Sequence, residues 1–219
     1  MTQAHSLLAS ATPAVWLFVG DSITQGALHT FGFRDFTQLF AERIRYELGR
    51  SRDIVLNIGV SGATSTDAIG YLEESMGKIT PSAAFIMLGV NDASEDRPHT
   101  ASGLQANLEK IYATLTAAES AVIFQTSPPL LPSAVKYHAK LPAMMQAVRD
   151  ASLSTGALLV DHAAYWPRYA AESPVRNLEY LMSDPVHPNN YGHALLARHL
   201  LEALAIFDPA SPVGRTFIP

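Results

Sequence analysis

The sequence predicts an α/β fold in which five parallel strands form one sheet with helices on both of its faces. Five short apolar runs rich in Val, Ile, Leu and Phe recur along the chain, at residues 14–19, 54–58, 83–88, 121–125 and 157–160. These runs lack polar alternation, as expected of strands that are covered on both faces. Segments of helical period separate them, and such alternation is typical of doubly wound sheets with right-handed crossovers.

The intervening segments each place apolar residues three or four positions apart, which gives a helix one apolar stripe directed toward the sheet. A final helix is expected from about residue 190 to residue 205, with Leu196, Leu200 and Leu204 on its apolar face. The four stripes between strands are Phe36, Leu39, Phe40, Ile44 and Leu48; Ile69, Leu72 and Met76; Leu104, Leu108, Ile111 and Leu115; and Leu141, Met144, Met145 and Val148.

The length and uniform composition of the chain predict a single domain over residues 1–219. Of these residues 48% are hydrophobic and 16% are charged, which supplies a core and differs from the composition of disordered proteins. We expect residues 1–12 and 209–219 to be peripheral. Apolar residues of the tail, Phe207, Phe217 and Ile218, are available to dock on another copy, so a homo-oligomer is among the expected assemblies.

The charge and cysteine content exclude several function classes. Lys and Arg number 15 against 20 Asp and Glu, a formal charge of −5, and no basic run is present that would neutralise a row of phosphates. We therefore expect no nucleic-acid partner. The sequence contains no Cys, which excludes thiol catalysis and leaves any metal site to histidine and carboxylate ligands.

The sequence shows neither a membrane span nor a signal segment. The apolar run at 14–19 is too short to cross a bilayer, and no basic segment precedes the weakly apolar residues 7–11. We expect a soluble, cytoplasmic protein.

Polar turns follow the first three predicted strands, at residues 20–22, 59–62 and 89–92. The carboxyl ends of parallel strands meet at one rim of the sheet, where α/β folds bind their ligands. The fourth strand runs into a proline-containing loop, residues 126–142, which is expected to shape a pocket at the same rim.

Ser22 is the candidate nucleophile at this rim. It lies where a strand gives way to a helix, so its hydroxyl and its own backbone N–H are presented to the same space. A serine hydroxyl needs a base to become nucleophilic. The alternative role for Ser22 is an ordinary helix N-cap.

The candidate base is His187, in the segment Asp184-Pro185-Val186-His187-Pro188. The prolines stiffen this segment. In that setting Asp184 is placed to accept a hydrogen bond from one ring nitrogen of His187 and to leave the other nitrogen free as a base. Taken singly, Asp184 also fits the role of a helix-capping residue, and His187 that of an ordinary surface histidine.

Attack on a carbonyl creates an oxyanion that needs hydrogen-bond donors. Gly62 offers an unobstructed backbone N–H, Asn91 offers a side-chain amide, and Ser22 offers its own N–H. As an alternative, Gly62 and Asn91 are both residue types that turns require for conformational reasons alone.

Four short blocks resemble the SGNH, or GDSL-like, hydrolase superfamily, in the order of that family. They are Gly20-Asp21-Ser22-Ile23, Ser61-Gly62, Gly89-Val90-Asn91-Asp92 and Asp184-Pro185-Val186-His187. The chain has Ile23 where the older motif has Leu, and it lacks the Gly-x-Ser-x-Gly pentapeptide of another hydrolase fold.

The resemblance implies roles for these residues and a sheet topology. Ser22 is the nucleophile, His187 is its base and Asp184 orients the base. Ser22, Gly62 and Asn91 form the oxyanion hole. The implied fold is a three-layer α/β/α arrangement with the flavodoxin-like strand order 2-1-3-4-5, and no cofactor or metal is implied.

These residues predict a serine esterase acting on a small-molecule or saccharide ester, with short-chain acetyl esters as the leading substrates. The rim aromatics and histidines expected to stack on a sugar are His29, Phe31, Phe33, Tyr137, His138, Tyr165 and Trp166. Alternatives with the same triad are a lipolytic esterase or thioesterase that uses residues 130–145 as an acyl groove, and an O-acyltransferase.

Two further classes stay open at this stage. A non-catalytic binding module would keep the fold without turnover. A metal-dependent hydrolase would draw its ligands from the following set: Asp21, Asn91, Asp92, His187 and His193.

Overall fold

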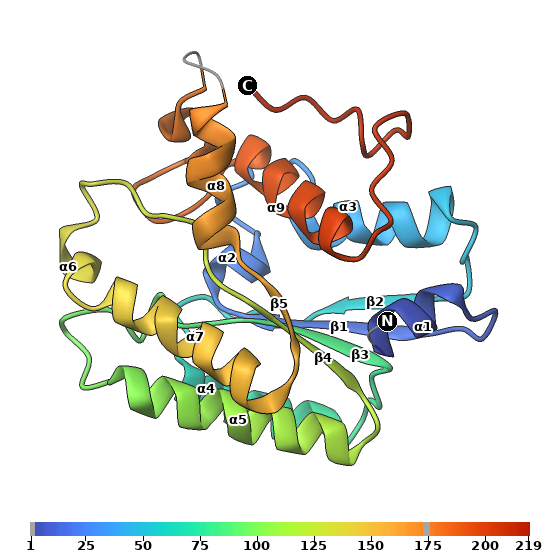
Figure 1. Ribbon diagram of the computed structural model, residues 1–219, viewed down its shortest axis with the longest axis horizontal. Helices are drawn as coiled ribbons and strands as arrows, with labels where there is room; N and C mark the ends of the chain where they lie inside the picture. Colours follow the sequence, from blue (N-terminus) through green and yellow to red (C-terminus); the bar gives the residue numbers. More distant parts are fainter. Residues whose placement is uncertain (1–2, 173–175) are drawn as a thin grey trace.

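A five-stranded parallel sheet forms the centre of the computed structural model, which describes residues 3–172 and 176–219 (Figure 1). The strands are β1 (Val15–Gly20), β2 (Ile54–Asn57), β3 (Ala83–Met87), β4 (Ala121–Gln125) and β5 (Leu158–Val160). All neighbouring pairs are parallel, and the order is β2-β1-β3-β4-β5. The predicted fold class and strand order are confirmed.

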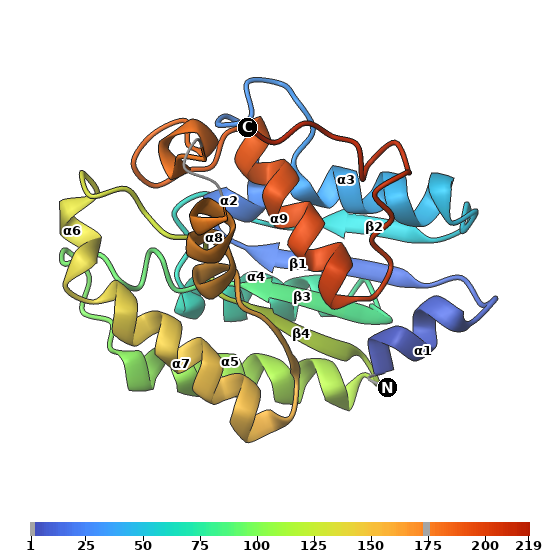
Figure 2. The same cartoon turned by 45° about the horizontal axis from the view of Figure 1, so that its top comes forward.

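Helices cover both faces of the sheet (Figures 1 and 2). On one face lie α4 (Ser65–Met76), α5 (Ala101–Ala117) and α7 (Leu141–Thr155). The other face carries α3 (Phe36–Glu42), α8 (His162–Ala171) and α9 (Asn190–Ala203). The shorter elements are α1 (Gln3–Ala9), α2 (Ser22–Gln25), α6 (Val135–His138) and a 3₁₀ turn at Leu178–Leu181. None of the helices in the described part of the chain has the length and apolar character that crossing a membrane requires.

An aromatic cluster fixes β1 against its neighbours. Phe18 of β1 stacks on Phe85 of β3, with ring centroids 4.5 Å apart, and meets Phe36 and Phe40 of α3 edge to face. All four rings are fully buried. Since such pairs add to the free energy of burial, this cluster anchors the strand that leads directly to Ser22.

The helix predicted over residues 36–48 differs from expectation in its second half, where Arg43–Glu47 widens into a π-helical turn. Arg43 is nearly buried there and donates from Nε to the carbonyl of Ile206, 2.8 Å away, while its Nη1 lies 3.0 Å from Glu47. This contact with the chain beyond α9 accompanies the widened turn, and residues 36–48 alone do not encode it.

Helix α8 was not predicted, and its side chains correct two assignments at the rim. Trp166 is fully buried, and Tyr165 stacks on His199 of α9 and donates to Glu202. Both aromatics therefore pack α8 on α9 and are unavailable to a sugar. Tyr137, in α6, is also buried.

Two histidines are enclosed between α8, α9 and the end of β4. His162 Nδ1 lies 3.0 Å from His199 Nδ1, and His162 Nε2 lies 3.1 Å from Gln125 Oε1. Burial, with His199 adding, holds the pKa of His162 well below its usual value, and burial lowers the pKa of His199 to about 4. Both rings are therefore neutral in the folded protein at neutral pH.

This pair predicts an acid-sensitive fold. A ring whose pKa is lower in the folded chain than in the unfolded chain stabilises the fold fully above pH 6.5, and this stability is lost as the pH falls toward 4. Between pH 6.5 and pH 4 the free energy of unfolding should fall less in His199→Gln than in the wild type. The difference between the two falls should be roughly 2 kcal/mol after allowing for the partial exposure of the ring. Urea unfolding at both pH values measures this difference.

The matched control is His138→Gln, since His138 is exposed and lies outside this pair. Its pH dependence should equal that of the wild type. Identical pH dependence in His199→Gln and the wild type would contradict the assignment of acid sensitivity to the buried pair.

Candidate active site

Ser22 begins the helix α2 directly after β1. Its hydroxyl Oγ lies 2.9 Å from His187 Nε2. The N-cap of α2 is Asp21, whose carboxylate accepts the Ile23 N–H at 2.9 Å. The capping role that the sequence left open for Ser22 therefore belongs to Asp21, and the Ser22 hydroxyl is free to face the histidine.

Asp21 is buried beneath this turn. Burial raises the pKa of its carboxyl group to about 7, the hydrogen bond from Ile23 opposes the rise, and Asp92 adds to it. A carboxyl group held in this way supports the turn and is poorly suited to draw a cation or a substrate to the rim.

Asp184 holds His187 through both its ring and its backbone. The ring Nδ1 lies 2.9 Å from Asp184 Oδ1 and 2.8 Å from Oδ2, and Oδ1 also accepts the N–H groups of Val186 and His187. Although partial burial opposes it, these hydrogen bonds lower the pKa of Asp184. Because a carboxylate only accepts, Nδ1 carries the ring proton and Nε2 is free to accept one from Ser22.

The predicted oxyanion donors come from three adjacent strand ends. The Ser22 N–H lies in the first turn of α2, where amides have no partner within the helix. Gly62 has a φ of 78°, and apart from its two chain neighbours no described residue lies within 4 Å of the position that a Cβ would occupy. Asn91 donates one amide hydrogen to Ala63 O at 3.1 Å, which leaves its second hydrogen available.

Two hydrogen bonds hold these loops to one another. Val60 N–H donates to Gly20 O at 3.0 Å, which joins the loop after β2 to the end of β1, and the bond from Asn91 to Ala63 O joins the loop after β3 to the loop after β2. The end of β1, which leads to Ser22, and the loops that carry Gly62 and Asn91 are therefore hydrogen-bonded in sequence.

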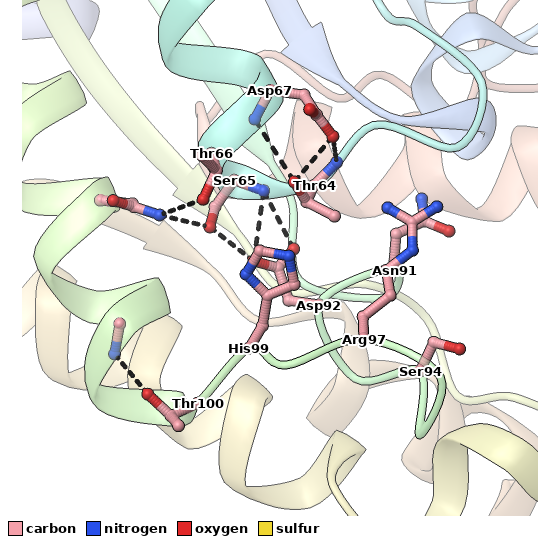
Figure 3. A network of polar contacts seen from close by, with 12 residues as sticks. Thr64, Ser65, Thr66, Asp67, Asn91, Asp92, Ser94, Arg97, His99 and Thr100 are labelled. Carbon is pink, nitrogen blue, oxygen red and sulfur yellow. Dashed lines mark hydrogen bonds and ion pairs between the residues drawn. The ribbon is translucent and has the colours of Figure 1, made fainter.

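A network of polar contacts centres on Asp92, the residue after Asn91 (Figure 3). Asp92 is fully buried and accepts hydrogen bonds from the Ser65 N–H, at 3.0 Å, and the Ser65 hydroxyl, at 2.5 Å. Asn107 of α5 donates to the same hydroxyl at 2.9 Å. The network fixes the start of α4 on the loop after β3. Sequence reasoning missed Ser65 and Asn107, although the capping box of Thr64 and Asp67 marks the start of α4.

The proline-containing loop after β4 is tied down on two sides. Leu131 N–H donates to Pro185 O at 2.9 Å, next to the Asp184 to His187 segment. Lys140 Nζ, at the far end of the loop, donates to Arg97 O at 2.7 Å. These contacts hold the loop beside the Asp184 to His187 segment.

The structure does not assemble the five residues named as metal ligands in the sequence analysis. Asp92 is committed to Ser65, and His193 Nδ1 accepts the Phe36 N–H at 3.2 Å. One cluster within residues 3–172 and 176–219 has metal-ligand proximity, namely His29, Asp184 and His187. Its two imidazole rings lie face to face within 2° of parallel, so their in-plane lone pairs do not converge on one ion.

The fold and this site define a class of α/β enzyme with a serine and a histidine at the carboxyl ends of parallel strands. The profile of the GDSL-like Lipase/Acylhydrolase family matches residues 18–195, which include every block described above. The chain belongs to this family and is a carboxylic ester hydrolase.

Solved structures of similar proteins share the fold. LAE5, an alpha/beta hydrolase enzyme from the metagenome of Lake Arreo, Spain, is 21% identical, with a TM-score of 0.76 over 91% of this chain and 98% of that chain. A lipase/acylhydrolase from Enterococcus faecalis is 22% identical, with a TM-score of 0.75 over 90% and 99%. An acetylxylan esterase from Geobacillus stearothermophilus is 22% identical, with a TM-score of 0.73 over 91% and 97%.

A shorter stretch resembles an uncharacterized protein of Mycoplasma pneumoniae. The two are 37% identical over 59 residues, which are 27% of this chain and 7% of that protein.

Removal of the Asp92 carboxylate should destabilise the site-bearing loops. Asp92→Ala leaves the Ser65 N–H and hydroxyl without their acceptor, and we expect the free energy of unfolding to fall by roughly 2–3 kcal/mol. The matched control is Asp96→Ala, in the same loop, where the side chain is 78% exposed and its loss should change stability by less than about 0.5 kcal/mol. Equal urea unfolding curves for the two variants would contradict the structural role of Asp92.

Proposed function

We propose that this chain is a serine esterase in which Ser22 is the nucleophile, His187 the general base and Asp184 the residue that orients it. The observation that carries the proposal is the continuous relay from Asp184 to His187 Nδ1 and from His187 Nε2 to Ser22 Oγ, with 2.8–2.9 Å between the hydrogen-bonded atoms. This is the geometry that activates a serine hydroxyl for attack on a carbonyl.

In the acylation half-reaction, Ser22 Oγ attacks the ester carbonyl carbon while its proton moves to His187 Nε2. His187 then gives this proton to the alcohol oxygen as the carbon–oxygen bond of the ester breaks, which leaves the acyl group on Ser22. Water repeats the cycle, because His187 takes its proton as the water oxygen attacks the acyl carbon. The acid leaves when His187 returns the proton to Ser22 Oγ.

The Ser22 N–H, the Gly62 N–H and the Asn91 amide are proposed to hold the oxyanion of each tetrahedral intermediate. The hydrogen bond between Asn91 and Ala63 supports this role, since it fixes the amide before the reaction begins. Donors held in advance require no reorganisation as negative charge develops on the carbonyl oxygen.

We propose short-chain acetyl esters, carried on a saccharide, as the substrates. The similarity to the acetylxylan esterase fold supports this choice. Phe31 and Phe33 also support it, because both lie in the loop after α2 and expose 72% and 64% of their surface. Exposed aromatic faces are suited to stack on a sugar ring.

The contacts of the residues once considered as an acyl groove favour a short acyl group. A cavity of about 350 Å³ is lined by Pro128, Pro129, Leu130, Leu141, Pro142, Met145, Arg149, Ala163 and Pro167. This lining includes none of Ser22, Gly62, Asn91, Asp184 and His187, and Leu130 and Met145 are themselves buried in the core. A long acyl chain bound to Ser22 would need an apolar groove that begins at the nucleophile.

Acyl-chain selectivity tests this proposal. We expect kcat/KM for p-nitrophenyl acetate to exceed that for p-nitrophenyl octanoate by at least about tenfold, since the apolar cavity formed by Leu130 and Met145 is not lined by Ser22 and would not bury the extra methylenes. Steady-state hydrolysis of both esters measures the ratio. A preference for octanoate would instead identify a lipolytic esterase.

Two variants assign the measured activity to the site. Ser22→Ala should lower kcat/KM for the acetate ester by at least about 10⁴-fold, since a serine nucleophile lost from a triad cannot be replaced by water. Thr30→Ser keeps the hydroxyl of a buried residue in the following loop and should stay within about threefold of the wild type. Full activity in Ser22→Ala would overturn the assignment of the nucleophile.

A further inference from the structure

A second imidazole lies face to face with the candidate base. The ring of His29 is stacked on the ring of His187, with centroids 3.5 Å apart and planes within 2° of parallel. His29 Nδ1 lies 3.3 Å from Asp184 Oδ2, the carboxylate oxygen that His187 Nδ1 approaches to 2.8 Å. His29 therefore contacts two of the three members of the relay, His187 and Asp184, and the reaction scheme above leaves it without a role.

The loop that carries His29 is held at both ends. Gly26 ends α2 with a φ of 67° and donates its N–H to Ser22 O, and a Cβ at Gly26 would lie 2.6 Å from the Cβ of Asp35. Asp35 is the N-cap of α3, so the two ends of the loop touch. Thr30, adjacent to His29, is buried and donates from its hydroxyl to Gly26 O at 3.0 Å. These contacts fix the backbone on both sides of His29.

The charges around His29 favour a neutral ring. Burial lowers the pKa of His29, and His187 lowers it further, while Asp184 opposes both. A further titratable group coupled to the stack is His193 of α9, where burial, then His29 and His187, lower the pKa to about 3. At neutral pH the ring facing His187 therefore carries no charge to repel the proton that His187 receives from Ser22.

The stacked ring has two physical consequences for His187. The His29 ring covers one face of the His187 imidazole, and Asp184 binds one edge of that imidazole. Rotation of the His187 ring about its Cβ–Cγ bond is therefore opposed by the packed His29 ring. The His29 ring also places a neutral aromatic face against the imidazolium that forms when Ser22 is deprotonated, an arrangement that stabilises a cation.

We infer that His29 is a positioning residue for His187: its ring keeps the base in line with Ser22 and supports the cationic form during the reaction. The inference rests on the proposed function, since it assigns His29 a role through the base. His29 touches neither the reacting oxygen nor the substrate in this scheme.

Three substitutions separate the ring face from the contact with Asp184. His29→Ala removes both, His29→Asn keeps a nitrogen donor without a ring, and His29→Phe keeps a ring without a nitrogen. For hydrolysis of p-nitrophenyl acetate we expect kcat to fall at least about tenfold in His29→Ala and His29→Asn, with KM within about threefold of the wild type. His29→Phe should recover most of the lost kcat. Wild-type kcat in His29→Ala, or better recovery in His29→Asn than in His29→Phe, would overturn the inference.

The matched control is Leu28→Ala, since Leu28 is the preceding residue and is 77% exposed. It should keep kcat within about twofold, which separates loss of the His29 ring from disturbance of the loop. Thermal unfolding of each variant verifies that the chain is folded.

Proton NMR supplies a readout that does not depend on turnover. The His187 Nδ1 proton, identified by its loss in His187→Gln, should give a slowly exchanging downfield signal in the wild type and in His29→Phe. In His29→Ala the signal should broaden through exchange with water. If the wild type hydrolyses no ester, the proposed function fails, but the NMR signal still tests whether His29 positions His187. An unchanged signal in His29→Ala would overturn that positioning role.

Discussion

A 2.9 Å contact between Ser22 Oγ and His187 Nε2 joins two parts of the chain that are 165 residues apart. Ser22 is held by β1, whose aromatic side chains are fully buried, and by the cap that Asp21 provides. His187 is held by Asp184 and by the turn that leads into α9. The chemistry of the site depends on these two supports meeting to within the length of a hydrogen bond.

Several contacts outside the site fix the turn that carries His187. Asn189 caps α9 by accepting the N–H groups of Tyr191 and Gly192, and its amide donates to the carbonyls of Tyr180 and Met182. On the other side, Leu131 of the loop after β4 donates to Pro185 O. The segment that carries the proposed base is thus held by the residues before it, by the helix after it and by the loop after β4. The geometry of the candidate site therefore depends on several elements along this rim of the sheet.

The sequence was sufficient for the features that depend on local pattern. The strands β1, β3 and β4 are buried apolar runs, and the edge strands β2 and β5 are partly exposed but largely apolar, so composition marks all five. The polar blocks at the carboxyl ends of the first three strands follow directly. The strand order 2-1-3-4-5 came from the resemblance of those blocks to a family. Only the structure distinguishes the two roles considered for Ser22, N-cap and nucleophile. Asp21 and Ser22 both lie at the strand-to-helix junction, and both are good N-cap residues.

Other features depend on contacts between distant residues and were not predicted. His29 was assigned to a sugar-binding rim because its partner His187 is far away in the sequence. The link between Asp92 and Ser65 and the π-helical turn at Arg43 likewise need residues from separate elements. Helix α8 begins at the capping residue Asp161, but its interior Pro167 obscures the helical pattern.

Covalent labelling tests directly whether Ser22 is an activated nucleophile. A fluorophosphonate probe should add one phosphonyl group to the wild-type protein at neutral pH, with the adduct on the peptide that contains Ser22 in mass spectrometry. Labelling should be absent in Ser22→Ala and slowed in His187→Gln, because the hydroxyl then lacks its base. An unlabelled wild-type protein, or an adduct on another serine, would contradict the account.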